Sequence, residues 1–276
     1  MFGQATAGAD RQRSAPARFG GLLAILLALP FAPLAAQPCL SDRIDERVRV
    51  SVVQDGDTVM LSDGRRLRLI GINTPELGNQ ERGPQAGAIA ARDRLRQLVF
   101  SNQQQLQLRF DTERQDRYGR LLAHAFLADG RNITELLLDE GAGTQIVIPP
   151  NTWQARCYQQ AARSARAGQR GLWALAEYRP VPVAQLSLRS EGFHIVRGRV
   201  SHLSHSASAT WINLTDKLAL RIERADLGQF EGFDLEALAG REIEVQGWLY
   251  ARRGQLRLPL RHPAGLEIFT PQNRLE

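Results

Sequence analysis

Lysine is almost absent from this chain: Lys217 is its single copy, so arginine supplies nearly all of the positive charge. The net charge is +6 over 276 residues. Residues 1–36 contain three arginines and one aspartate, a net +2, and their removal would leave about +4. This mild excess suits a polyanionic partner without proving one. The hydrophobic fraction of 43% and the charged fraction of 23% are typical of a soluble globular protein.

The chain also lacks a long hydrophobic run. Its longest, from Leu22 to Leu34, is shorter than the roughly 20 residues needed to cross a bilayer. Arginines precede this run and small residues follow it, a pattern typical of a signal peptide over residues 1–36. We expect cleavage after Ala36, no stable membrane span afterwards, and a periplasmic or secreted protein. An uncleaved anchor is the alternative, and Pro38 before Cys39 argues against a lipid-modified cysteine.

Cysteine is scarce as well, with two copies, Cys39 and Cys157. Both belong to the part of the chain expected to be exported. Because oxidising compartments favour disulfides, we predict a bond that ties the mature N-terminus to a late helix. Two unrelated buried thiols are the alternative.

Hydrophobic periodicity predicts a mixed fold in residues 37–173. Alternating patterns indicate strands at 47–53, 58–61, 66–72, 106–110 and 120–127. Helical spacing and capping signals indicate helices at 84–99, 132–141 and from 152 to Gly168. The helix at 84–99 is expected to bury Ala88, Ala91, Leu95 and Leu98. Short strands interrupted by helices favour a five-stranded barrel with three helices packed on it, an α+β fold that is mainly β.

A second region follows this one. Residues 174–191 contain two prolines and little periodicity, and we expect a linker there. Residues 192–276 again show alternating patterns, which predict a second, smaller five-stranded barrel with a helical turn at 233–238. The Asp-Gly-Asp-Thr stretch of residues 55–58 has no second copy, so the second region is not expected to hold a second active site of the same kind.

Oxygen-bearing side chains cluster at the ends of the first and third predicted strands. Asp57 is the strongest candidate metal ligand, because calcium accepts carboxylate, amide and backbone carbonyl oxygens together. If these two strands are neighbours, Asn73 and the carbonyl of Thr74 converge on Asp57. An ordinary turn is the alternative for residues 55–57.

Two arginines and one glutamate complete the candidate chemistry. Arg68 lies among apolar residues in a predicted strand, where a charge is costly unless it is paired or binds an anion. With Arg120, it could hold a phosphate, since planar guanidinium groups match the equatorial oxygens of a phosphoryl transition state. Glu76 is placed to take a proton from water. Arg117 and Tyr118 are weaker candidates for a second phosphate and a sugar or base. Surface salt bridges and a surface glutamate are the alternatives.

Three motifs in this order resemble the staphylococcal nuclease (thermonuclease) family: residues 55–58 (DGDT), 68–76 (RLIGINTPE) and 116–120 (DRYGR). The resemblance covers about residues 48–173. It implies an OB-type five-stranded barrel with three helices, and calcium-dependent hydrolysis of DNA and RNA that leaves 3′-phosphate ends. By position, it implies that the calcium ion binds to Asp57, Asn73 and the Thr74 carbonyl, that Arg68 and Arg120 hold the phosphate, and that Glu76 activates water. Asp55 would support the ion without contacting it.

Two departures from the family matter. The best-known member has an aspartate where this chain has Asn73, so we expect weaker calcium binding. Residues 145–148 (QIVI) stand where tyrosines line the nucleotide pocket in that member. Because stacking on aromatic rings contributes about 1–3 kcal/mol per base, their loss should loosen the hold on a base.

The leading hypothesis is therefore an exported, calcium-dependent endonuclease, expected to act as a monomer, with unknown protein partners. The alternative is a nuclease-like module with a disabled metal site that binds nucleic acid or protein. A structural protein of the cell envelope is a third hypothesis, but it would leave the charged cluster unexplained. In the second region, Trp211, Trp248, Tyr250 and the pair 252–253 could form a nucleic-acid surface, although structural or protein-docking roles are the alternative.

Overall fold

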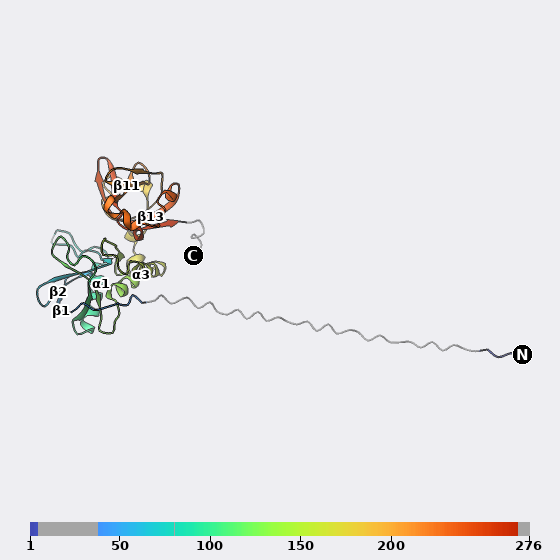
Figure 1. The fold of residues 1–276 in the computed structure, drawn as a ribbon, viewed down its shortest axis with the longest axis horizontal. Coiled ribbons are helices and arrows are strands. Elements are labelled where there is room, and N and C mark those ends of the chain that lie inside the picture. Colours follow the sequence, from blue (N-terminus) through green and yellow to red (C-terminus); the bar gives the residue numbers. More distant parts are fainter. Residues whose placement is uncertain (5–37, 80, 270–276) are drawn as a thin grey trace. The chain divides into compact units, whose positions relative to one another are not determined.

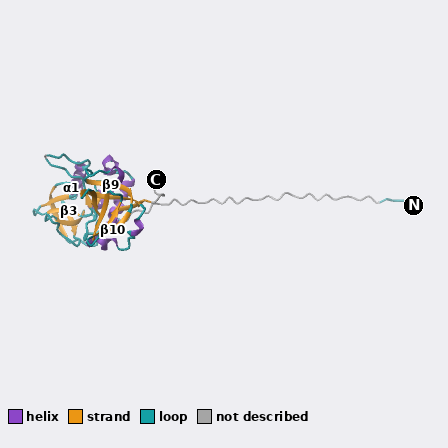
Figure 2. Cartoon of the chain, turned by 90° about the horizontal axis from the view of Figure 1, so that it is seen from above, coloured by secondary structure: helices purple, strands orange, loops and turns teal. Residues whose placement is uncertain are grey.

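A computed structural model describes residues 1–4, 38–79 and 81–269 of the chain (Figure 1). The hydrophobic run and the cleavage site predicted for residues 1–36 lie outside the described residues. Within the described part, no helix has both the length and the apolar character needed to cross a membrane. Strands and loops make up most of this part, with fewer helices (Figure 2).

The first half of the chain forms the predicted closed barrel, which we call the barrel module (residues 38–173). Its strands are hydrogen-bonded in the order β1-β2-β3-β6-β5. They are β1 (Glu46–Val53), β2 (Thr58–Leu61), β3 (Arg66–Leu69), β5 (Gln105–Arg109) and β6 (Leu121–Phe126). In β1, alternation places Val48 and Val50 in the core. Val52 was expected beside them but is exposed, because an irregularity between Val50 and Val52 shifts the register and Val53 faces inward instead.

The third strand is shorter than the predicted 66–72. It ends at Leu69, and residues 72–73 form a separate strand β4 (Ile72–Asn73), which pairs with β7 (Thr144–Gln145). The break lies at Gly71, whose φ angle of +92° is disfavoured for residues with a side chain. The ring of Tyr158 also lies 2.4 Å from where a Cβ on Gly71 would be. The backbone therefore turns here, which carries Asn73 away from the line of β3.

Three helices pack on the barrel, as predicted. They are α1 (Ala88–Ser101), α2 (Ile133–Asp139) and α3 (Ala155–Ala167). The four residues expected in the core from α1 are all buried. This helix begins at Ala88 rather than Pro84, because Gly87 has a left-handed conformation that ends the preceding turn.

The start of α2 differs in part from the predicted capping pair. The side chain of Asn132 accepts a hydrogen bond from the backbone N–H of Glu135, as a helix cap should. The carboxylate of Glu135 does not return to Asn132. It instead accepts a hydrogen bond of 2.9 Å from the backbone N–H of Cys39. The cap thus fastens the N-terminal segment to α2.

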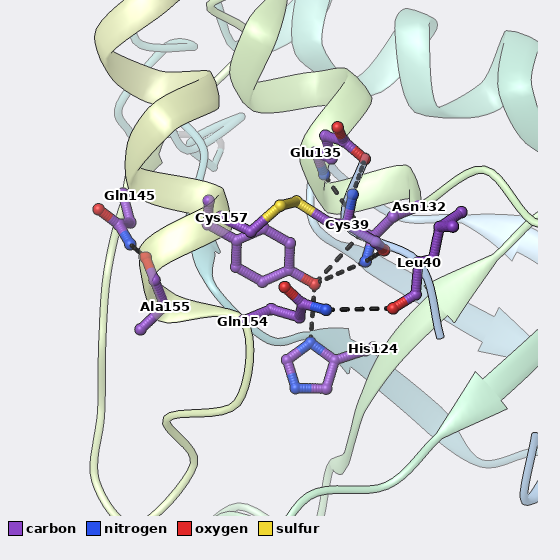
Figure 3. The surroundings of a disulfide bond; sticks show 10 residues. Cys39, Leu40, His124, Asn132, Glu135, Gln145, Gln154, Ala155 and Cys157 are labelled. Carbon is purple, nitrogen blue, oxygen red and sulfur yellow. Dashed lines mark hydrogen bonds between the residues drawn. A yellow bond between two sulfur atoms is a disulfide. The ribbon is translucent and has the colours of Figure 1, made fainter. Parts of the chain in front are cut away.

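The predicted disulfide is confirmed: Cys39 and Cys157 are bonded, with 5.8 Å between their Cα atoms (Figure 3). A buried polar chain lies beside it. The Tyr158 hydroxyl contacts His124 Nδ1 at 2.8 Å and accepts a hydrogen bond from Asn132 at 2.9 Å. Burial lowers the pKa of His124 and raises that of Tyr158, so both side chains remain uncharged inside the fold.

The second half of the chain forms a sheet, which we call the sheet module (residues 181–269). Its strands follow the order β10-β11-β12-β14-β13-β9-β8, with β15 also paired to β13. They are β8 (Val181–Pro182), β9 (Gly192–Arg199), β10 (His202–His205), β11 (Ala209–Asn213), β12 (Leu218–Glu223), β13 (Glu242–Arg252), β14 (Gln255–Pro259) and β15 (Leu266–Phe269). Short 3₁₀ turns complete it, one of them at 236–238 within the helical turn predicted for 233–238.

The predicted second closed barrel is not confirmed among these strands. Only residues 200–201 separate β9 from β10. If β9 and β10 are counted as two halves of one bent strand, the strand order of the sheet module is the same as that of the barrel module. The expectation of a linker over 174–191 is wrong in part. Residues 181–182 pair with β9, and Val183 and Leu186 are buried in the core of the sheet module. The prolines in this segment obscured the sequence pattern of a short edge strand. Proline is tolerated in the edge strands of a sheet.

A buried charge joins the two modules. Glu244 of β13 is 2% exposed and forms ion pairs with Arg166 of α3 and, at 3.0 Å, with Arg197 of β9. Two side-chain-to-backbone hydrogen bonds support it, from Gln246 to the Gln145 carbonyl (3.1 Å) and from Arg261 to the Pro149 carbonyl (3.3 Å). A carboxylate this deeply buried is stable only when it is paired, so Glu244 fixes the sheet module against the barrel module.

Candidate active site

Asp57 lies in the turn between β1 and β2, where the barrel strands end. Its side chain is 8% exposed, and both of its oxygens have partners. Oδ2 accepts hydrogen bonds from the backbone N–H of Thr74 (2.8 Å) and from its hydroxyl (3.1 Å), and Oδ1 accepts one from Thr58 (3.1 Å). Gly56 makes this approach possible, because a Cβ there would lie 2.7 Å from the Thr74 hydroxyl oxygen.

Arg68 connects the candidate metal ligands. It projects from β3, and its Nη2 lies 3.0 Å from Asp57 Oδ2 and 3.4 Å from Asn73 Oδ1. Its Nη1 donates to the Leu69 carbonyl at 2.7 Å. The amide nitrogen of Asn73 in turn donates to the Thr74 carbonyl at 3.3 Å. The structure therefore brings Asp57, Arg68, Asn73 and Thr74 together, and the costly charge in β3 is paired.

Asp55 stands behind Asp57. Its Oδ1 accepts a hydrogen bond of 2.9 Å from the backbone N–H of Asp57, which shapes the turn. Burial raises the pKa of Asp55 to about 6, and the negative charge of Asp57 acts in the same direction. Asp55 thus supports the turn rather than adding a ligand oxygen beside Asp57.

The donor set fits a calcium ion. A carboxylate oxygen of Asp57 and the amide oxygen of Asn73 both lie within 3.4 Å of one point, the Nη2 of Arg68. These are the oxygen types that calcium accepts. The guanidinium neutralises the carboxylate of Asp57, and a cation cannot occupy the place of this nitrogen. Elsewhere in the described ranges, three potential metal-binding side chains come together only at Cys39, Glu135 and Cys157, where the disulfide occupies both sulfurs.

Glu76 lies next to this group and remains free to react. It lines a hollow of about 130 Å³ together with Asn73 and Pro75. Its backbone N–H donates to Gln85 Oε1 at 2.8 Å, which holds the residue in place. Among the described residues, no hydrogen bond or ion pair engages its carboxylate, so that group is available to bind water.

Arg120 and its neighbours form a second hollow. The side chains of Arg66, Tyr118 and Arg120 line a space of about 290 Å³. Arg120 is held by Asp116 at 2.7 Å, and Arg117 donates to the Tyr118 hydroxyl at 2.7 Å. Arg120 directly precedes β6, which runs parallel to β3. No contact joins Arg120 to Arg68, so the phosphate candidates occupy adjoining strands rather than one cluster.

Some residues at these hollows were not identified from the sequence. Arg66 lines the second hollow, and its Nη2 donates to the Tyr118 carbonyl at 3.3 Å. Tyr178, Phe193 and Trp248, which belong to the second half of the chain, line the hollow that contains Glu76. Trp248 was a candidate nucleic-acid contact, but nothing in the sequence placed it beside Glu76. Only the contacts between the modules bring it there.

Comparison with known proteins agrees with this geometry. A family model described as "Staphylococcal nuclease homologue" matches residues 66–175. The thermonuclease of Staphylococcus intermedius is 33% identical over 131 residues, which cover 46% of this chain and 76% of that protein. The endonuclease YncB of Bacillus subtilis (strain 168) is 33% identical over 129 residues, 45% of this chain and 60% of that protein. An uncharacterized endonuclease of Escherichia coli O157:H7 is 31% identical over 144 residues, 49% of this chain and 80% of that protein.

The closed barrel, its three helices and the charged group at its rim define a nuclease. The chain belongs to the staphylococcal nuclease family. The matched region ends near residue 175, so the sheet module lies outside the match to the family model.

Proposed function

We propose that this protein is an exported, calcium-dependent endonuclease that hydrolyses phosphodiester bonds of DNA and RNA and leaves 3′-phosphate ends. One observation supports it above all. Asp57, Arg68 and Asn73 converge within 3.4 Å, and the unpaired carboxylate of Glu76 lines a hollow with Asn73. This arrangement combines cation ligands, a phosphate-binding guanidinium and a general base.

In the proposed reaction, Glu76 accepts a proton from water while the water oxygen attacks phosphorus. The bond to the 5′ oxygen breaks, that oxygen takes up a proton, and the phosphate stays on the 3′ side. Arg68 and Arg120 stabilise the charge that builds on the equatorial oxygens. A calcium ion held by Asp57, Asn73 and the Thr74 carbonyl would polarise the phosphate.

Export is part of the proposal and has separate support. The disulfide between Cys39 and Cys157 suits an oxidising compartment such as the periplasm or the exterior. The pattern of residues 1–36 agrees with it. Mass spectrometry of the protein recovered from its host would test this directly, with an N-terminus at residue 37 as the expected result.

A second candidate is a binding module with a disabled metal site. The observation in its favour is that Arg68 already forms an ion pair with Asp57 and a hydrogen bond to Asn73, with no second carboxylate among the candidate ligands. Such a module would hold nucleic acid without cleaving it. The free carboxylate of Glu76 has no role in this alternative.

One assay separates these two functions. Purified residues 37–276 are incubated with single-stranded DNA, with calcium or with chelator. We expect calcium-dependent cleavage, with kcat reduced by roughly 10²–10⁴ in Glu76→Gln and by roughly 10²–10³ in Arg68→Ala. Arg68→Lys tests the planar fork, because lysine keeps the charge and loses the bidentate geometry. Retarded bands of intact DNA in both conditions would favour the binding module.

A further inference from the structure

We propose that the sheet module supplies a nucleobase-binding subsite to the active site, formed by the rings of Phe193 and Trp248 with Tyr178 behind them. The ligand class is single-stranded nucleic acid, and the subsite would hold a base next to the cleaved phosphodiester. The inference rests on the proposed function, because the same strand must reach Glu76.

The aromatic rings form a continuous row. Trp248 on β13 and Phe193 on β9 are opposite each other in the sheet, with ring centroids 5.2 Å apart and an interplanar angle of 67°. Tyr178 lies 6.1 Å from Phe193, and Trp173 lies 6.4 Å from Tyr178. Edge-to-face contacts of this kind hold rings in a fixed orientation. Trp248, at the end of the row, is 42% exposed, which leaves ring surface available to a ligand.

This row borders the candidate active site. The hollow of about 130 Å³ is lined by Asn73, Glu76 and Gln85 of the barrel module and also by Tyr178, Phe193 and Trp248, which follow it in the chain. A strand whose phosphate lies near Glu76 would therefore bring an adjacent sugar and base against these rings. A base in that position replaces water on an exposed indole, which favours binding.

The barrel module contributes no aromatic rings at this place. Residues 146–148 (IVI) carry no rings and line a third hollow, of about 180 Å³. Phe193 and Trp248 line that hollow too, so the two rings stand between both hollows. The aromatic surface at these hollows is therefore supplied by residues after the barrel module.

The outer face of the sheet module offers a path for the rest of the strand. Tyr250 lies two residues beyond Trp248 on the same face of β13 and is paired with Arg257 of β14. The guanidinium of Arg257 lies 4.7 Å from the ring centroid of Trp211. Its Nε is buried with no hydrogen-bond partner in the described residues. Alternating rings and guanidinium groups are the usual surface for single strands, whose unstacked bases are free to meet them.

The test compares variants of residue 248 in residues 37–276. Trp248→Ala removes the ring, Trp248→Leu fills much of the space without a ring, and Trp248→Phe keeps one. Phe100→Ala is the matched control, because Phe100 is 54% exposed on α1 and lines neither hollow. Substrates are a single-stranded 12-mer of DNA and the same 12-mer with abasic positions on both sides of the cleaved bond.

We expect KM for the intact 12-mer to rise about tenfold in the alanine and leucine variants, with kcat within about twofold of the original. The phenylalanine variant should recover most of the loss, and Phe100→Ala should change nothing. The abasic 12-mer should already bind weakly and should barely respond to Trp248→Ala. Equal KM values for the original protein and Trp248→Ala on the intact 12-mer would overturn the subsite while leaving the nuclease in place.

Failure of the proposed function gives a different result. If the original protein cleaves nothing, affinity for the 12-mer is measured by fluorescence anisotropy in the same variants. A tenfold weaker Kd in Trp248→Ala and Trp248→Leu would then support the subsite in a binding protein. An unchanged Kd would overturn it. If Trp248→Phe lost as much affinity as Trp248→Leu, the subsite would also be overturned, because stacking on an aromatic ring would then not be the cause.

Discussion

The barrel module and the sheet module share a strand order but use it differently. In both, the third strand in the order runs parallel to the fourth, β3 with β6 and β12 with β14. The barrel closes and gathers charged and polar groups at one end of its strands, at Asp57, Arg68 and Asn73. The sheet carries rings on its outer face and, among the residues described, no comparable group of ligands.

The difference indicates that the two modules contribute different parts of one reaction. A closed barrel fixes strand ends relative to one another, so it can hold a carboxylate and a guanidinium 3.0 Å apart. The broad outer face of a sheet instead presents rings along neighbouring strands, which suits an extended ligand. Chemistry and affinity are therefore expected to respond to different substitutions.

The disulfide should give the largest contrast between the modules. Its two cysteines are 118 residues apart and both belong to the barrel module, so reduction should destabilise that module by on the order of 4–5 kcal/mol. Hydrogen exchange resolved by peptide, with and without reductant, measures this. Amides of β1 and β2 should exchange faster, while those of β11 and β12 keep their rates. Equal acceleration in both sets would mean that the modules unfold as one unit.

Glu244→Gln should weaken the contact between the two modules, and the loss of stability should be smaller than that caused by reducing the disulfide. Loss of the buried carboxylate leaves Arg166 and Arg197 without their shared partner. We expect the free energy of unfolding to fall by about 3 kcal/mol, the lower end of the range for breaking a buried ion pair, because both arginines also reach solvent. Urea denaturation measures it. Glu223→Gln is the control, since that 52% exposed carboxylate pairs with Arg221 within the sheet module and should cost less than about 1 kcal/mol. Equal losses would show that Glu244 does not fix the contact.

Asn73→Asp should have the smallest effect, and it tests whether residue 73 binds calcium. A second carboxylate beside Asp57 should tighten calcium binding by about tenfold, because ligand charge sets the affinity of such sites. Calorimetric titration with calcium measures the change. Gln85→Glu adds the same charge in the hollow that Asn73 also lines, without supplying a predicted ligand, and it should tighten calcium binding less. Identical affinities in the Asn73→Asp protein and the original would exclude residue 73 as a ligand.

Much of the barrel module could be predicted from the sequence, because its strands alternate and its turns carry Asp-Gly pairs. The predicted ends of the elements were wrong where a tertiary contact determines the end of the element. The ring of Tyr158, far along the chain, accounts for the turn at Gly71, and no local pattern shows it. The edge strand at 181–182 was missed for a related reason, since two residues flanked by prolines show no periodicity.

The candidate site could be predicted in its residue types but not in its surroundings. The motifs placed Asp57, Arg68 and Asn73 in order along the chain. The first and third strands are not neighbours as expected, because β2 lies between them, and the side chains come together through the pairing of β2 with β3. Arg66 and Phe193 escaped notice because their position depends on packing between segments far apart in sequence. An aromatic residue on a predicted strand shows that it can stack, but only its neighbours in space show against what.

Glu244 also imposes an order on how a new chain is completed. Folding generally proceeds from the N-terminal part of a chain onward, so α3 can form before β13 folds against it. Until β13 arrives, Arg166 has no Glu244 to meet. A molecule cut short before residue 244 would hold a finished barrel with an uncovered docking surface, a ready substrate for proteases. Arg166 on α3 therefore gains its buried partner only once β13 has folded against the barrel module.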